Sequence, residues 1–222
     1  MDFVLCYAIR STWNIYTLSF IYTCFLATLN NKIKNKWNKY YNSNVEVSTR
    51  PSDVLFFNHH LLPKNGDALD LACGFGLNAI CLAENRLQVT AWDISELALE
   101  KLSIHSKQLN LKVCCEVRDV LKHPPQPNTF DVIVVSKFLD RKLIKNIKKS
   151  IKSNWLIFYQ TFTKNRIDKS GPKNPDYQLD ENELLRFFSD SKLIFYKEEG
   201  VTGDLKRGFR NQAMIISQKN KL

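Results

Sequence analysis

Short apolar runs alternate with amphipathic segments along most of the chain. Runs of apolar residues predict strands, and segments with apolar residues three or four positions apart predict helices between them. Ser95 precedes such a segment and is the expected N-cap of a helix. Alternating strands and helices are typical of a parallel sheet with helices on both faces. The predicted strands are residues 68–72, 88–93, 112–117, 131–136, 155–161, 193–199 and 212–217, and the predicted helices are residues 77–84, a segment from 95, 141–152 and 180–188.

Residues 68–79 join the first predicted strand to the first predicted helix. The strand carries Asp70 near its end, and Gly74 and Gly76 follow before the helix begins. A glycine-containing turn allows backbone to approach a ligand closely and directs the unpaired N–H groups of a helix toward it. This segment therefore predicts a binding site for a nucleotide-like cofactor.

Two kinds of cofactor fit this segment. Residues 74–79 match the dinucleotide fingerprint G-x-G-x-x-G/A, and Asp93 lies about 20 residues on, where a ribose-binding acid is expected. However, Asp70 would repel a pyrophosphate, whereas it would favour a ligand with an ammonium group and a sulfonium. Asp119, after another predicted strand, can accept a hydrogen bond from the amine of a purine.

These segments resemble the motifs of class I S-adenosylmethionine-dependent methyltransferases, and they are most similar to bacterial proteins related to the tellurite-resistance methyltransferase. The resemblance covers roughly residues 37–218. Ala72 departs from the usual pattern because it replaces the first glycine, and Ser153-Asn154 stands where relatives usually have Pro-Gly-Gly before the fifth strand. The matching segments are residues 69–76 for the first motif, 91–95 for the ribose-binding motif, 118–120 for the adenine-binding motif and 130–136 for the fourth strand.

The resemblance implies an α/β, Rossmann-like fold with a seven-stranded, mostly parallel sheet, helices on both faces and an antiparallel last strand. It also implies S-adenosylmethionine as cofactor and methyl transfer as the activity. The ligands of such sheets bind beyond the carboxyl ends of the strands. The expected cofactor-binding residues are Asp70, Ala72, Cys73, Gly74, Gly76, Asn78, Asp93, Ile94, Asp119, Val120 and Ser136.

The methyl acceptor is less clearly encoded. A sulfonium methyl group is already activated, so a general base is needed only if the acceptor must lose a proton. His59 or His60 and Tyr40 or Tyr41 are candidates for that base, although a structural role fits the histidines as well. Arg141 can hold an anionic acceptor or form a surface ion pair.

Three other functions remain as alternatives to methylation of a small molecule such as a thiol, an oxyanion or a metabolite. They are RNA methylation, NAD-dependent oxidoreduction and cofactor binding without activity. The net charge of +10 includes a lysine-rich face on the predicted helix 141–152, which fits either a solvated helix or a phosphate-binding surface.

The cysteines bear on metal binding and on the location of the protein. The six cysteines lack the paired spacing of metal ligands, so we expect no metal site, reduced thiols and a cytoplasmic location. Cys73 lies in the cofactor loop and is expected to pack there.

Residues 161–177 show no periodicity, and we expect this long loop to lie on the substrate side.

The first 36 residues form an extension before the expected methyltransferase domain, residues 37–222. Residues 11–29 carry no charge, and their length approaches that of a membrane span. Three interpretations fit: a membrane-associated helix, an extra helix packed on the domain, or a dispensable extension. We favour the last because the resemblance begins only near Trp37. The oligomeric state is not encoded in any motif.

Overall fold

The computed structural model describes residues 31–43 and 49–221, and residue contacts divide the chain into residues 1–44 and 45–222. In the first unit, residues 31–43 form a helix on which the rings of Trp37 and Tyr41 stack with centroids 6.0 Å apart. Residues 11–29 lie outside the described residues, as does Cys6, and the boundary expected after residue 36 stays a prediction. None of the helices in the described ranges combines the length and the apolar character that a membrane crossing requires.

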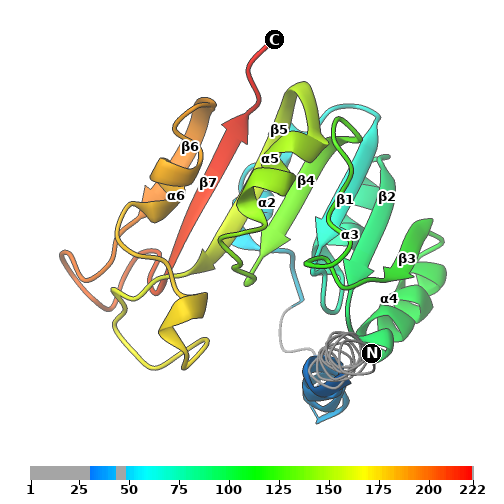
Figure 1. Ribbon diagram of the computed structural model, residues 1–222, viewed down its shortest axis with the longest axis horizontal. Helices are drawn as coiled ribbons and strands as arrows, with labels where there is room; N and C mark the ends of the chain where they lie inside the picture. Colours follow the sequence, from blue (N-terminus) through cyan, green and yellow to red (C-terminus); the bar gives the residue numbers. More distant parts are fainter. Residues whose placement is uncertain (1–30, 44–48, 222) are drawn as a thin grey trace, which may run out of the picture. The chain divides into compact units, whose positions relative to one another are not determined.

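The described residues of the second unit form a seven-stranded sheet, which Figure 1 shows from one face. The strands are β1 (Asp67–Leu71), β2 (Gln88–Asp93), β3 (Val113–Val117), β4 (Phe130–Ser136), β5 (Ile151–Phe162), β6 (Lys192–Glu198) and β7 (Gln212–Gln218). Their order in the sheet is β3-β2-β1-β4-β5-β7-β6. Strands β1 to β5 are parallel, and β7 is antiparallel to both β5 and β6. The expected α/β fold with an antiparallel last strand is confirmed.

Helices cover both faces of the sheet. They are α2 (Asp53–Phe56), α3 (Leu77–Glu84), α4 (Glu96–Gln108), α5 (Ile144–Ser150) and α6 (Glu183–Phe187), with 3-10 turns at His59–Leu61 and Pro175–Tyr177. The central strand β4 shows how the sheet divides the core. Val132 and Val134 pack in one apolar cluster with α2, α3 and α4, whereas Ile133 and Val135 pack in another with α5 and α6. Because alternate side chains point to opposite faces, a strand covered on both sides is apolar throughout.

The connection from α5 to β5 differs from the expectation. The predicted helix 141–152 and strand 155–161 are wrong in their bounds, because α5 ends at Ser150 and β5 begins at Ile151. Ile151 has the spacing of a buried helical residue, but its backbone pairs with Phe130 of β4. The apolar spacing at this position therefore fits a helix and a strand equally well.

Lys152 and Asn154 show why the strand begins early. Lys152 Nζ lies 2.9 Å from a carboxylate oxygen of Asp131 and 3.1 Å from one of Asp67, so this lysine joins β4 to β1 instead of lying on a solvated helix face. Asn154 has a φ of +67°, and the register between β4 and β5 shifts just before Val132. The Ser153-Asn154 pair, expected in a turn before the strand, thus lies in a bulge within β5.

Other elements follow the sequence pattern more closely. Both α3 and β2 have the predicted bounds, and the Ser95 hydroxyl accepts the N–H of Ala98 at 3.3 Å as the N-cap of α4. Strand β1 ends before Ala72 because that residue has a φ of +54°. The predicted helix 180–188 begins late, at Glu183, because Asn182 has a φ of +58°.

Candidate cofactor site

The loop between β1 and α3 turns tightly. Ala72, Gly74 and Gly76 all have left-handed backbone conformations, with φ values of +54°, +56° and +76°. A side chain on Gly76 would bring its Cβ within 2.4 Å of Leu102 on α4. Glycine at this position therefore permits both the turn and the close approach of α3 to α4. The result is a tight, largely buried loop at the carboxyl end of β1, where the sequence predicted a glycine-containing turn.

Asp70 lies near the end of β1, just before this loop, and its side chain is fully buried. Its carboxylate accepts the N–H of Ala79 at 3.0 Å and lies 3.5 Å from the amide nitrogen of Asn78. Burial raises the pKa of Asp70 to about 8, because no ion pair offsets the loss of solvation in the described part of the chain. A cationic group of a ligand near this carboxyl would favour its charged form.

Asp93 joins the loop to the end of β2. One of its carboxylate oxygens accepts the N–H of Gly74 at 2.9 Å, and the other accepts the N–H of Ser95 at 2.8 Å. Burial raises the pKa of Asp93, and the hydrogen bonds from Ser95 and Gly74 oppose that effect. Each carboxylate oxygen can accept further hydrogen bonds, which is what a pair of ribose hydroxyls requires.

Asn78 connects three elements around the site. Its amide nitrogen donates to the Ser136 hydroxyl of β4 at 3.0 Å. Its amide oxygen accepts from both the N–H and the hydroxyl of Ser52, at 2.9 and 2.8 Å. The sequence indicated Asn78 and Ser136, but not Ser52. The signal for Ser52 was its position directly before a short apolar segment, which is typical of a helix start.

The remaining residues of the expected adenosine site follow β2 and β3. Ile94 is half-buried after Asp93, and Val120 is buried in the apolar cluster of α5 and α6. Asp119 is half-buried, and its carboxylate accepts the N–H of Leu121 at 3.1 Å. The structure places these residues after neighbouring parallel strands, at one edge of the sheet. Their contacts with a cofactor stay predictions.

Cys73 is the cysteine of the loop. Burial and the nearby carboxylates of Asp70 and Asp93 raise the pKa of its thiol well above the usual range. Such a thiol stays protonated and is a poor nucleophile. It packs against the cluster of α2, α3 and α4, which fits the expected packing role. In the described residues, no group of histidine, cysteine or acidic side chains is arranged to hold a metal ion.

Arg141 follows β4 and forms an ion pair. Its guanidinium contacts both carboxylate oxygens of Glu183 at 2.8 Å, and it also donates to the carbonyls of Asp176 and Gln178. Of the two roles considered for Arg141, this geometry is that of the ion-pair partner. Arg141 therefore links the loop after β5 to the segment that follows β4.

The candidates for a general base lie in two different units. His59 and His60 are exposed in the 3-10 turn, where Nδ1 of His59 lies 2.8 Å from the carbonyl oxygen of Phe56. Tyr40 and Tyr41 lie on the helix of the first unit, with their ring centroids 5.2 Å apart. The catalytic roles of His59 and Tyr41 stay predictions.

This geometry agrees with a comparison against protein families. Residues 68–154 match a family model described as a methyltransferase domain. This match supports a class I methyltransferase domain over the segment that holds the site. The matched residues run from β1 into β5 and include the loop after β1, Asp93 and Asn78. The cofactor of this kind of domain is S-adenosylmethionine, and the resemblance seen in the sequence is confirmed.

Curated relatives of the domain include the ubiquinone biosynthesis O-methyltransferases. The protein of that name from Coxiella burnetii is 26% identical over 120 residues, which cover 52% of this chain and 51% of the relative. The one from Vibrio cholerae is 24% identical over 156 residues, which cover 61% of this chain and 62% of the relative. The chain thus spans about half the length of the first of these relatives.

Solved structures share the fold at low sequence identity. TehB from Haemophilus influenzae has a TM-score of 0.63 and 23% identity, and the alignment covers 83% of this chain and 67% of TehB. This likeness confirms the methyltransferase fold of the domain.

Proposed function

We propose that the protein is an enzyme that transfers a methyl group from S-adenosylmethionine to a small molecule. The observation that carries this proposal is the tight loop between two buried carboxylates, Asp70 and Asp93, in a methyltransferase domain. When bound, S-adenosylmethionine supplies a methyl group on a positively charged sulfur. The fit of the site to this molecule rests on the chemistry of its donors and acceptors.

Asp70 and Asp93 have separate roles in the proposed site. Asp70 is buried without a cationic partner in the described residues, so it suits the ammonium group of the cofactor. Asp93 keeps hydrogen-bonding capacity for the ribose hydroxyls. A pyrophosphate beside Asp70 would raise the pKa of its carboxyl further, whereas the positive charges of S-adenosylmethionine favour the charged form. This contrast supports S-adenosylmethionine over NAD.

The other predicted residues complete the proposed site. Gly74 and Gly76 allow the left-handed turns that bring the backbone of the loop close to the ligand, and Ile94 and Val120 provide apolar contacts for the adenine. Asp119 offers a carboxylate for its amine. Ala72, Cys73, Asn78 and Ser136 shape the floor of the site, with Asn78 holding the start of α2 against β4.

A small molecule is the acceptor class that the relatives support. The relatives named above are O-methyltransferases, so we propose a hydroxyl oxygen as the first acceptor atom to test, beside the thiols and oxyanions expected from the sequence. None of the comparisons reported above favours RNA methylation or NAD-dependent chemistry. Cys73, Cys81, Cys114 and Cys115 are free thiols, which supports a cytoplasmic location.

An acceptor screen tests this function. The full chain is incubated with methyl-labelled S-adenosylmethionine and one acceptor at a time: hydroxylated metabolites, thiols, tellurite, selenite or total RNA. We expect S-adenosylhomocysteine release that depends on a small molecule. Release with RNA alone would contradict the proposed acceptor class. Absence of release with every acceptor, in protein that does not bind S-adenosylmethionine, would contradict the proposed enzyme.

A further inference from the structure

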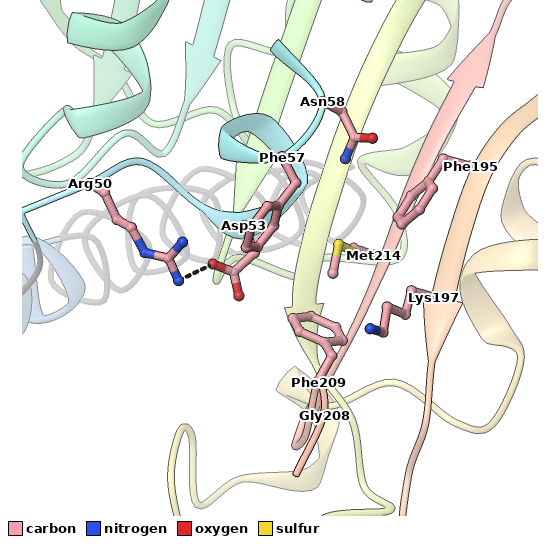
Figure 2. A pocket seen from close by; sticks show the side chains of 9 residues that line it. All are labelled: Arg50, Asp53, Phe57, Asn58, Phe195, Lys197, Gly208, Phe209 and Met214. Carbon is pink, nitrogen blue, oxygen red and sulfur yellow. Dashed lines mark ion pairs between the residues drawn. The ribbon is translucent and has the colours of Figure 1, made fainter. Parts of the chain in front are cut away.

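A cavity of about 490 Å³ lies beside α2, where β6 and β7 meet the loop that joins them. Figure 2 shows its walls: Phe57 and Asn58 follow α2, Met214 comes from β7, and Phe195 from β6. Met214 and Phe195 belong to the sheet face that α2, α3 and α4 cover. Of these three helices in the described residues, the short α2 packs most closely on β5 and β7.

Hydrogen bonds connect the cavity to the candidate cofactor site. Ser52, which precedes α2, donates both its N–H and its hydroxyl to Asn78 on α3. On the other side, the N–H of Val54 donates to the side-chain oxygen of Gln160 at 2.7 Å. Gln160 pairs with Met214 near the carboxyl end of β5, so the cavity lies toward the sheet edge that also carries the cofactor loop.

The apolar walls favour a planar ligand. The cavity is lined by the rings of Phe57, Phe195 and Phe209 and by the thioether of Met214, which come from four parts of the chain. Aromatic rings bind one another in offset or edge-to-face geometry, and methionine sulfur also contacts ring edges favourably. Phe57 remains 59% exposed, so its ring is available to cover a bound molecule.

The charged side chains favour one negative charge on that ligand. Arg50 forms an ion pair with Asp53 at 2.7 Å, so these two lining residues balance each other. Lys197 is the remaining lining cation, and Figure 2 shows its Nζ directed toward Phe209. Lys197 also contacts Glu199 at 2.9 Å, but Glu199 does not line the cavity, so the lining side chains carry one net positive charge. A ligand carboxylate can therefore share the ammonium group of Lys197.

We propose that this cavity binds the methyl acceptor and that the acceptor is a planar aromatic molecule with one negative charge. This inference rests on the proposed function. The nucleophilic atom of the acceptor gains the methyl group and loses its proton to solvent, while the bonding electrons stay on the sulfur of the donor. The ring lies among the phenylalanines, and the anionic group faces Lys197.

Binding and methylation of benzoates test the inference. The probes are 3,4-dihydroxybenzoate, its uncharged analogue catechol, 4-mercaptobenzoate and 4-aminobenzoate, titrated into the full chain by calorimetry with S-adenosylhomocysteine present. Lys197→Met removes the cation, and Met214→Trp fills the cavity. Lys192→Met is the matched control, because Lys192 is exposed on the same strand and does not line the cavity.

We expect at least one benzoate to bind and to be methylated, and catechol to bind about tenfold more weakly than 3,4-dihydroxybenzoate. Lys197→Met and Met214→Trp weaken benzoate binding about tenfold or more, whereas Lys192→Met and the binding of S-adenosylmethionine remain unchanged. Equal benzoate binding in all variants, binding without methylation, or no benzoate binding by protein that still binds S-adenosylmethionine would each overturn the inference. If the unmodified chain does not bind S-adenosylmethionine, the result would instead contradict the proposed function.

Discussion

The buried carboxyl of Asp70 makes the stability of the protein depend on pH. Its pKa is about 8 in the folded protein against an ordinary value of 3.8, so the folded state holds a proton that the unfolded state has released between these values. The free energy of unfolding should fall as pH rises from about 4 to about 8, at up to about 1.4 kcal/mol per pH unit from this group.

Asp70→Asn tests this effect because asparagine keeps an oxygen for the Ala79 N–H but does not ionise. We expect the variant to be more stable than the unmodified chain at pH 8 by a few kcal/mol, and similar to it at pH 4. Urea unfolding at both pH values measures the difference. Asp204→Asn, at an exposed position, should show no such change. A stability difference that does not depend on pH would contradict the account of Asp70.

Ala72 stands in a backbone conformation that favours glycine, with a φ of +54°. Ala72→Gly should stabilise the protein by roughly 0.5–1 kcal/mol, because glycine adopts this conformation without steric cost. Ala79→Gly, inside α3, should destabilise it by about 1 kcal/mol and serves as the contrast. Thermal unfolding of both variants measures these effects. Destabilisation by Ala72→Gly would show that the alanine methyl packs favourably in the loop.

At the scale of single residues, sequence reasoning found the side chains of the site but not all of their partners. Asp70, Gly74 and Asp93 lie at strand ends, and that position follows from local patterns. Ser52 was missed because its partner Asn78 is 26 residues away, and only the folded chain brings them together.

Elements were predictable where one periodicity dominates. The helix that starts after Ser95 has a cap and a consistent apolar face, and its start is correct. The start of β5 was not predictable, because Ile151 satisfies helical spacing while Lys152 is held by Asp67 and Asp131 from distant parts of the chain. Tertiary ion pairs of this kind do not appear in local sequence patterns.

At the scale of elements, the position of the long loop after β5 depends on Arg141. Glu183→Gln should weaken the ion pair that holds Arg141 against the carbonyls of this loop. We expect trypsin to cleave at Lys169 and Lys173 about tenfold faster in the variant, since proteolysis follows local opening. Glu181→Gln, at an exposed position nearby, is the control. Equal cleavage rates in all three proteins would contradict this role of Arg141.

At the scale of the whole molecule, some of the positively charged side chains form ion pairs between elements. Lys148 pairs with Asp190, and Lys152 pairs with Asp67 and Asp131, so part of the lysine-rich segment serves to join elements. The sequence showed the alternation of strands and helices, but the cavity beside α2 could not be predicted. Its walls come from residues 50–58 and 195–214, which meet because α2 packs on β5 and β7 and because β7 pairs with β6.

Calorimetric titration of S-adenosylmethionine and NAD into the full chain and its Asp93→Ala variant tests the central claim most directly. We predict that the unmodified chain binds S-adenosylmethionine with a Kd between roughly 1 μM and 1 mM and shows no binding of NAD. Asp93→Ala should weaken the binding of S-adenosylmethionine at least about tenfold, since it removes a buried acceptor of charge-assisted hydrogen bonds. Binding of NAD without S-adenosylmethionine, or unchanged binding by Asp93→Ala, would contradict the account.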